Sequence, residues 1–207
     1  MNKKSTSTLS LIFEMIGLSL KKEDLTVGEF FLDLGERSHA LIIFVFSLPF
    51  LTPIPIPGLS VIFGGVIMIS AIAMIFNLPI KVPHYLAQRK ISSEKLAAVM
   101  NYLSKYLWRV EKIVHPRGEK FLNHFVARTF FCLIIFCSGF VLALPLPPGT
   151  NFPPALVCIL LSISLLEKDL LMAIIATIGF AVMAILFSSL TQLVISKIVK
   201  SLDFFRL

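Results

Sequence analysis

The sequence predicts an all-α integral membrane protein with two proline-broken helical hairpins, a C-terminal transmembrane helix and cytoplasmic amphipathic helices. Hydrophobic residues make up 57% of the 207 residues and charged residues 15%, and the mean hydropathy is +0.89. Residues 40–80, 129–166 and 170–196 contain no Asp, Glu, Lys or Arg, and a helix needs about 20 apolar residues to span a bilayer. Proline clusters interrupt the first two stretches. We therefore expect one membrane domain covering residues 1–207.

Residues 1–36 are predicted to form cytoplasmic or interfacial helices. Residues 5–20 resemble a short amphipathic helix, but Glu14 interrupts the apolar run and no small-residue cleavage site follows it. A signal peptide is therefore not expected. Thr26 and Glu29 have the spacing of a capping box, which predicts the start of a second helix that leads towards the membrane.

The first repeat unit, residues 37–80, consists of two apolar arms around a proline-rich break. The break at 53–58 reads PIPIPG, and each proline removes a backbone donor and clashes with the preceding turn. Such a break must be buried in protein, face water or lie near the membrane surface. The arm 40–51 has 12 residues, roughly 18 Å of helix, and is too short to span the bilayer, whereas the arm 59–78 could cross it.

Residues 81–127 form a basic section that we expect in the cytoplasm. Residues 81–128 hold ten Lys or Arg and three Asp or Glu, a net charge of +7, and the positive-inside rule favours the cytoplasmic side. Nucleic-acid binding is a poor explanation because membrane segments flank the section. From Ser92 onwards an amphipathic helix is predicted, lying on the inner leaflet or packing against the chain's own helices or a second subunit. Its apolar face comprises Leu96, Met100, Leu103, Leu107, Val110 and Val114.

The second repeat unit and the final span occupy residues 128–190. Arms at 129–144 and 152–166 flank a break that reads PLPPG. Arms of about 15 residues are short for a bilayer crossing, so they indicate either re-entrant hairpins or tightly bent helix pairs. The last apolar stretch is centred on 170–190 and leads into a basic tail at 191–207.

The basic tail conflicts with the simplest topology. Two in-and-out hairpins followed by one span would put the C-terminus outside, although Lys197, Lys200 and Arg206 favour the inside. We therefore expect one broken pair to cross the membrane only once. That arrangement predicts a periplasmic turn at 167–169.

A shift of 91 residues aligns the two units. It gives eight identities over residues 37–75, including the arginine that begins each unit and the Pro-Gly pair that ends each break. Duplicated units with broken helices occur in transporters, whose binding sites lie where the breaks meet. Parallel and inverted repeats both fit the alignment. The most specific pairs are Arg37 with Arg128, Pro57 with Pro148, and Gly58 with Gly149.

A few polar residues in these units are candidates for a binding site. Arg37 and Arg128 either extend (snorkel) to the headgroups of the inner leaflet or bind an anionic group. Ser60 and Asn151 either cap the helix after each break or leave its N–H groups to an anion, and the roles can coexist. The acidic residues of the 167–169 turn form either a solvated turn or a proton or cation site. The predicted substrate-binding set is Arg37, Pro57, Gly58, Ser60, Arg128, Gly149, Thr150, Asn151, Glu167 and Asp169.

The sequence contains no recognisable catalytic or metal-binding motif. It has no nucleophile elbow, no phosphate-binding glycine loop and no metal-ligand spacing, so we expect no enzyme, no cofactor and no metal. Cys132, Cys137 and Cys158 all lie in apolar stretches, and we interpret them as small core residues.

Five short motifs along the chain are specific when taken together. They are Gly35-Glu36-Arg37-x-His39, Pro55-x-Pro57-Gly58-x-Ser60, Gln88-Arg89-Lys90-Ile91, Asn151-x-Pro153-Pro154-Ala155 and Ser164-Leu165-Leu166-Glu167-Lys168-Asp169. This combination resembles the exopolysaccharide synthesis protein ExoD family over roughly residues 25–190. The resemblance implies a protein of the bacterial inner membrane that is associated with exopolysaccharide production.

Two functions are compatible with these features. The leading hypothesis is a transporter-like homodimer whose broken helices meet at a polar site and move a small anionic or sugar-linked solute in exopolysaccharide production or export. The alternative is a non-transporting scaffold that binds polysaccharide-assembly proteins through its basic section. In both cases the expected surroundings are the lipid bilayer of the inner membrane, without nucleic acid.

Overall fold

The computed structural model describes residues 37–51, 58–79, 115–144 and 149–204, with the side chains of Leu190 and residues 193–204 left out. Regular structure within these ranges is entirely helical, which confirms the all-α class. The helices predicted within 1–36 and from Ser92 to 114 lie outside the described residues. The described elements are α3 (Arg37–Ser47), η1 (Leu48–Leu51), α4 (Leu59–Ile75), α7 (Glu119–Leu122), α8 (Phe125–Ala143), α9 (Phe152–Glu167) and α10 (Leu170–Phe204).

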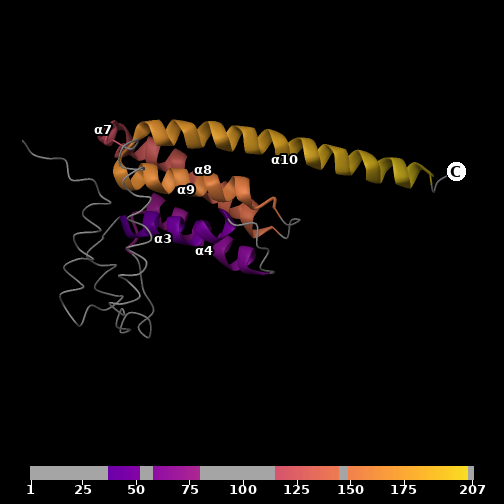
Figure 1. The fold of residues 1–207 in the computed structure, drawn as a ribbon, viewed down its shortest axis with the longest axis horizontal. Helices are drawn as coiled ribbons and strands as arrows, with labels where there is room; N and C mark the ends of the chain where they lie inside the picture. The colour runs from indigo at the N-terminus through magenta and orange to yellow at the C-terminus, as the bar shows by residue number, and fades with distance from the viewer. Residues whose placement is uncertain (1–36, 52–57, 80–114, 145–148, 205–207) are drawn as a thin grey trace, which may run out of the picture.

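Two of the described helices are long and apolar enough to cross a membrane. They are α8 and the first part of α10, Leu170–Ser189, which corresponds to the predicted final span. The segments α3 with η1, α4 and α9 are shorter apolar helices. Helix α10 continues through the predicted tail, and its 35 residues measure roughly 52 Å. Its C-terminal part therefore extends beyond the other helices (Figure 1).

Helices α3, α4, α8 and α9 form a four-helix core, and α10 packs on its outside. Helix α4 packs against α8, α3 packs against α9, and α10 lies along α9 (Figure 1). Helices α3 and α4 are antiparallel, because His39 at the start of α3 forms a hydrogen bond with the carbonyl oxygen of Leu78 just after α4. Helices α8 and α9 are antiparallel, because the chain at Gly118, shortly before α8, donates to Lys168 at the end of α9. We call the end of the bundle where α3 and α8 finish and α4 and α9 begin the break end. The opposite end, where α8 and α10 begin and α4 and α9 finish, is the charged end.

The interior of the four-helix core is closed by fully buried apolar side chains. Ile43, Ile67, Ile135, Leu142 and Leu161 have no solvent exposure. Large apolar side chains also cover the outside of the bundle, where their exposed fractions reach 50% to 69%. An apolar exterior around a close-packed interior suits a lipid environment, in which packing rather than hydrophobic burial holds helices together.

Two glycines allow α4 and α8 to approach closely. A Cβ atom on Gly64 would lie 2.6 Å from the carbonyl oxygen of Gly139 and 2.7 Å from the backbone nitrogen of Ala143. A Cβ atom on Gly139 would lie 2.9 Å from Cγ2 of Ile67. Small residues at helix crossings increase van der Waals contact between backbones, which is the main attraction available between helices in lipid.

We expect Gly64→Ala to destabilise the fold, because the added methyl group collides with backbone atoms of α8 that cannot rotate away. The expected loss is about 1–3 kcal/mol of unfolding free energy, as for other overpacked cores. The measurement is helical circular dichroism during unfolding by SDS in mixed micelles.

Gly65→Ala is the matched control for this substitution. No atom lies within 4 Å of a Cβ atom at Gly65, so this variant should be as stable as the parent or slightly more stable, because alanine favours helix. Equal stability of the two variants would contradict the close α4–α8 contact.

Candidate functional site at the two ends of the helix bundle

The predicted substrate-binding residues do not come together in one site. The 19 residues of α8 separate the break end from the charged end by roughly 28 Å. One group of predicted residues lies at each end, and Pro57 lies outside the described residues. The break end holds Gly58, Ser60, Gly149, Thr150 and Asn151, and the charged end holds Arg37, Arg128, Glu167 and Asp169.

At the break end, the two glycines provide left-handed backbone conformations. Gly58 has φ +81° and Gly149 has φ +92°, values that other residues rarely adopt. Gly58 occupies the N-cap position of α4 without a side chain to cap it. Ser60 is the second residue inside α4, so the prediction that Ser60 caps this helix is wrong.

Asn151 occupies the N-cap position of α9 but makes no capping hydrogen bond. A capping side chain accepts a hydrogen bond from the second or third helical residue, and in α9 these are Pro153 and Pro154, which have no N–H group. The capping prediction for Asn151 is therefore wrong, and α9 offers an anion few donors. The Asn151 Oδ1 atom is enclosed and has no hydrogen-bond partner among the described residues.

At the charged end, Arg128 closes the C-terminal end of α4. Its Nε donates to the carbonyl oxygen of Met74 at 3.1 Å, and its Nη2 donates to the same oxygen and to Oδ1 of Asn77. Asn77 is left-handed, with φ +51°, as is common just after a helix. A guanidinium at this position also interacts favourably with the negative end of the helix dipole. Arg37 is half-buried at the first position of α3.

Asp169 is fully buried and caps α10. Its Oδ1 accepts a hydrogen bond from the backbone N–H of Leu171 at 2.8 Å, and its Oδ2 accepts one from the N–H of His115 at 2.9 Å. Ser164 donates from Oγ to the Asp169 carbonyl oxygen at 2.8 Å. Glu167 is 5% exposed. The prediction of a solvated acidic turn is therefore wrong, because the turn is enclosed by protein.

The position of this turn corrects the predicted topology. The N–H of Gly118 donates to the carbonyl oxygen of Lys168 at 3.2 Å, and Lys168 Nζ donates to Oδ1 of Asn123. A Cβ atom on Gly118 would lie 2.6 Å from Cβ of Leu170, so the chain passes very close to the start of α10. The 167–169 turn thus lies at the same end as the last residues of the basic section, and not opposite to them.

Several residues at the charged end were not among the predicted site residues. Asn77 and Asn123 accept hydrogen bonds from the Arg128 and Lys168 side chains. His39 forms a hydrogen bond between Nε2 and the carbonyl oxygen of Leu78 at 2.8 Å, which joins the start of α3 to the end of α4. An asparagine after an apolar run is a known helix-stop signal and could have identified Asn77. No sequence signal identifies the long-range partners.

The core between the two ends contains a few small polar side chains. Ser47, Ser138 and Cys158 have no exposure. Ser47 Oγ donates to the carbonyl oxygen of Ile43 at 2.7 Å, and the hydroxyls of Ser47 and Ser138 lie next to the Cys158 thiol. Cys132 is also buried, but Cys137 is exposed, so the interpretation of all three cysteines as core residues is wrong for Cys137. No group of metal-ligating side chains occurs in the described ranges.

The fold and its ends define a helical protein whose bundle has an apolar outer surface and carries the charged residues of α3, α7, α8 and the 167–169 turn at one end. The chain belongs to the ExoD family, because the model of this family, described as exopolysaccharide synthesis, ExoD, matches residues 9–189. It is 29% identical over 156 residues to protein ExoD of Rhizobium meliloti (strain 1021). It is 26% identical over 135 residues to an uncharacterised protein of Synechocystis sp. (strain ATCC 27184 / PCC 6803 / Kazusa).

The matched regions cover 74% of this chain and 65% of the Rhizobium protein. They cover 65% of this chain and 63% of the Synechocystis protein. The chain thus spans slightly less than two thirds of each relative's length. No solved structure matches it.

We expect Arg128→Met to destabilise the fold by about 1–3 kcal/mol, because the carbonyl oxygen at the end of α4 loses a charged donor. Arg128→Lys should recover only part of the loss, since an ammonium cannot reproduce the fork of a guanidinium. The same SDS unfolding experiment measures both variants.

Arg117→Met serves as the control, because Arg117 is exposed and, among the described residues, its guanidinium interacts with the neighbouring His115 side chain. Its unfolding free energy should remain within about 0.5 kcal/mol of the parent, as for most surface substitutions. An Arg128→Met variant as stable as Arg117→Met would contradict the capping role.

Proposed function

We propose that this chain is a multi-pass inner-membrane protein that supports exopolysaccharide production by binding other components, and not by transporting a solute. Membership of the ExoD family supports the process. The closed four-helix core is the observation that carries the choice between binding and transport. A carrier of the predicted type needs a polar cavity where its breaks meet, whereas Ile67, Ile135 and Leu142 fill the centre of the core without exposure.

The positions of the predicted site residues also favour binding over transport. The candidate anion-binding residue Arg128 donates to the end of α4, and both carboxylate oxygens of Asp169 accept backbone N–H groups. These charges stabilise helix ends. A solute would have to compete with the fold for them.

We infer further that the chain arose by duplication, with both units in the same orientation. The described residues with positive φ form two pairs, Gly58 with Gly149 and Asn77 with Lys168. Each pair is separated by 91 residues, the shift that aligns the two units in sequence. Positive φ values are uncommon outside glycine, so their agreement supports a common backbone plan.

The hydrogen bonds that end α4 and α9 support the same duplication. The N–H of Leu78 donates to the carbonyl oxygen of Ala73 at 2.9 Å, and the N–H of Asp169 donates to that of Ser164 at 3.1 Å. Both are the long hydrogen bond of a Schellman turn, and they are again 91 residues apart. The packing of α4 on α8 and of α3 on α9 is what a pseudo-two-fold axis along the helices would produce.

The proposed orientation places the charged end in the cytoplasm, because the basic section joins the bundle there. With Cys132, Cys137 and Cys158 replaced by alanine, Thr150→Cys should react with a membrane-impermeant maleimide in intact cells. Lys120→Cys should react only after the membrane is opened. Labelling of both positions from the same side would contradict the orientation.

The choice between binding and transport can be tested by exopolysaccharide yield in a strain whose only copy is the variant. Asn151→Leu should keep the yield near that of the parent, because this side chain makes no capping hydrogen bond and its Oδ1 is unpaired within the part of the chain that the structure describes. Reversing the charge of the basic section through Lys105→Glu, Arg109→Glu and Lys112→Glu should reduce the yield severely.

The same threefold reversal in the tail, at Lys197, Lys200 and Arg206, controls for the change in net charge. The amount of each variant in the membrane is measured in parallel. Loss of yield in Asn151→Leu at normal protein level, with the basic-section variant unaffected, would overturn the binding role in favour of transport. The predicted homodimer remains a separate proposal, tested by the mass of the detergent complex.

A further inference from the structure

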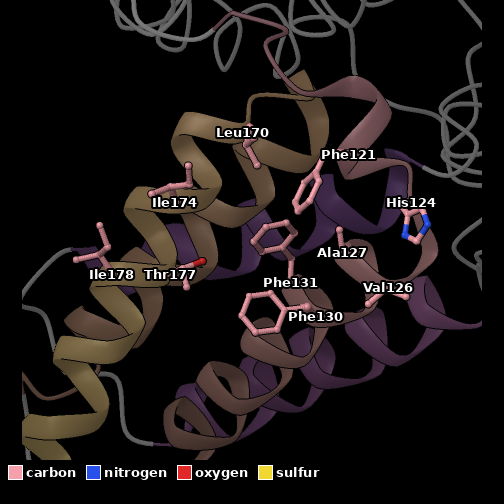
Figure 2. Close-up of a pocket in the computed structure, with 10 residues that line it drawn as sticks. All are labelled: Phe121, His124, Val126, Ala127, Phe130, Phe131, Leu170, Ile174, Thr177 and Ile178. Carbon is pink, nitrogen blue, oxygen red and sulfur yellow. The ribbon is translucent and has the colours of Figure 1, made fainter.

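We propose that an apolar groove between α8 and α10 binds the acyl chain of an anionic phospholipid, with the headgroup held at the charged end. This inference rests on the proposed placement of the chain in a membrane. The groove has a volume of about 660 Å³, within the roughly 300–1,000 Å³ typical of ligand pockets. Figure 2 shows its walls, with Ile174 and Ile178 on α10 and Phe130 and Phe131 on α8.

The walls of the groove are suited to a hydrocarbon chain. Only two of the ten lining residues, His124 and Thr177, have polar side chains. The Thr177 hydroxyl is already used, because it donates to the carbonyl oxygen of Ala173 at 2.7 Å. Phe130 is 50% exposed and Ile178 is 60% exposed, so the groove is open towards the surroundings of the bundle. An open apolar surface of this kind is covered by lipid or by protein.

The polar features of the groove are gathered at one end. His124 lines the groove where α8 begins (Figure 2), and exposed Lys120 precedes it on α7. Glu119 is the exposed acidic neighbour, while Asp169 is buried and accepts backbone N–H groups through both carboxylate oxygens. The described residues 115–124, which precede α8, carry Arg117 and Lys120 against Glu119, a net charge of +1. An apolar channel with a cationic opening matches a lipid with an anionic headgroup.

The same positive charge argues against two proteins as occupants of the groove: a second copy of this chain and the chain's own amphipathic helix. A second copy in a two-fold interface would place identical patches against each other, which brings the Lys120 side chains of both copies into one interface. The chain's own predicted amphipathic helix carries Lys105, Arg109 and Lys112 and would add positive charge to the opening. The cytoplasmic leaflet, in contrast, is rich in anionic lipids that attract basic residues near the membrane surface.

Tryptophan fluorescence in bilayers containing brominated lipid tests this proposal on the full chain. The chain has a single tryptophan, so Trp108→Phe gives a silent background in which Ile178→Trp reports from the groove. A brominated phosphatidylglycerol should half-quench this residue at about one-fifth of the mole fraction needed for brominated phosphatidylcholine, as expected for one Lys–headgroup contact.

Two further variants make the result specific to the groove. Ile185→Trp lies on α10 outside the groove, at a position that is 65% exposed, and should be quenched equally by both lipids. When Lys120→Gln and His124→Gln are added to the Ile178→Trp protein, the mole fraction that gives half-quenching should become the same for brominated phosphatidylglycerol and brominated phosphatidylcholine. This pattern supports the site.

The remaining outcomes contradict it. Equal quenching of Ile178→Trp by both lipids would mean ordinary surrounding lipid and overturns the proposal. Quenching of Ile185→Trp without quenching of Ile178→Trp would mean that protein covers the groove, which also overturns it. If neither position is quenched, α10 is not in lipid, and the membrane placement itself fails.

Discussion

The ends of helices leave backbone groups without intrahelical partners, and the polar residues at the charged end of this protein satisfy several of them. Arg128 supplies donors to the end of α4, and Asp169 supplies acceptors to the start of α10 and to the chain at His115. The Arg128–Met74 and Asp169–His115 hydrogen bonds each join residues 54 positions apart in the sequence. The polar side chains at the charged end therefore serve mainly to hold the ends of different helices together.

In the proposed membrane placement, the packing of the helices has a second constraint, because lipid provides no hydrophobic driving force between helices. Because Gly64 and Gly139 have no side chains, the backbones of α4 and α8 come into contact and gain van der Waals attraction. The resulting interior is filled to the centre by residues such as Ile67 and Leu142. An interior of this kind holds a rigid shape and favours a role that presents surfaces to other molecules.

The two proposed units share their turns and helix ends but differ in their surroundings. Helix α10 follows the second unit and extends well beyond the bundle (Figure 1). Its divergence from α8 creates the apolar groove that opens next to His124. The proposed duplication accounts for the symmetric arrangement of these helices, and the groove lies where α10 departs from that symmetry. This asymmetric surface is where we locate recognition of lipid, while the basic section remains the candidate for recognition of protein.

The sequence by itself determined the helical class, the two breaks and the final span, because uncharged stretches and proline clusters act locally on the backbone. It also indicated the family. Only the tertiary structure decided what the polar residues do. Asn151 could not be recognised as an ineffective cap until the helix start was known to put Pro153 and Pro154 at the donor positions. The partners of Arg128 and Asp169 could not be predicted, because hydrogen bonds between distant segments depend on how the helices pack and not on local pattern.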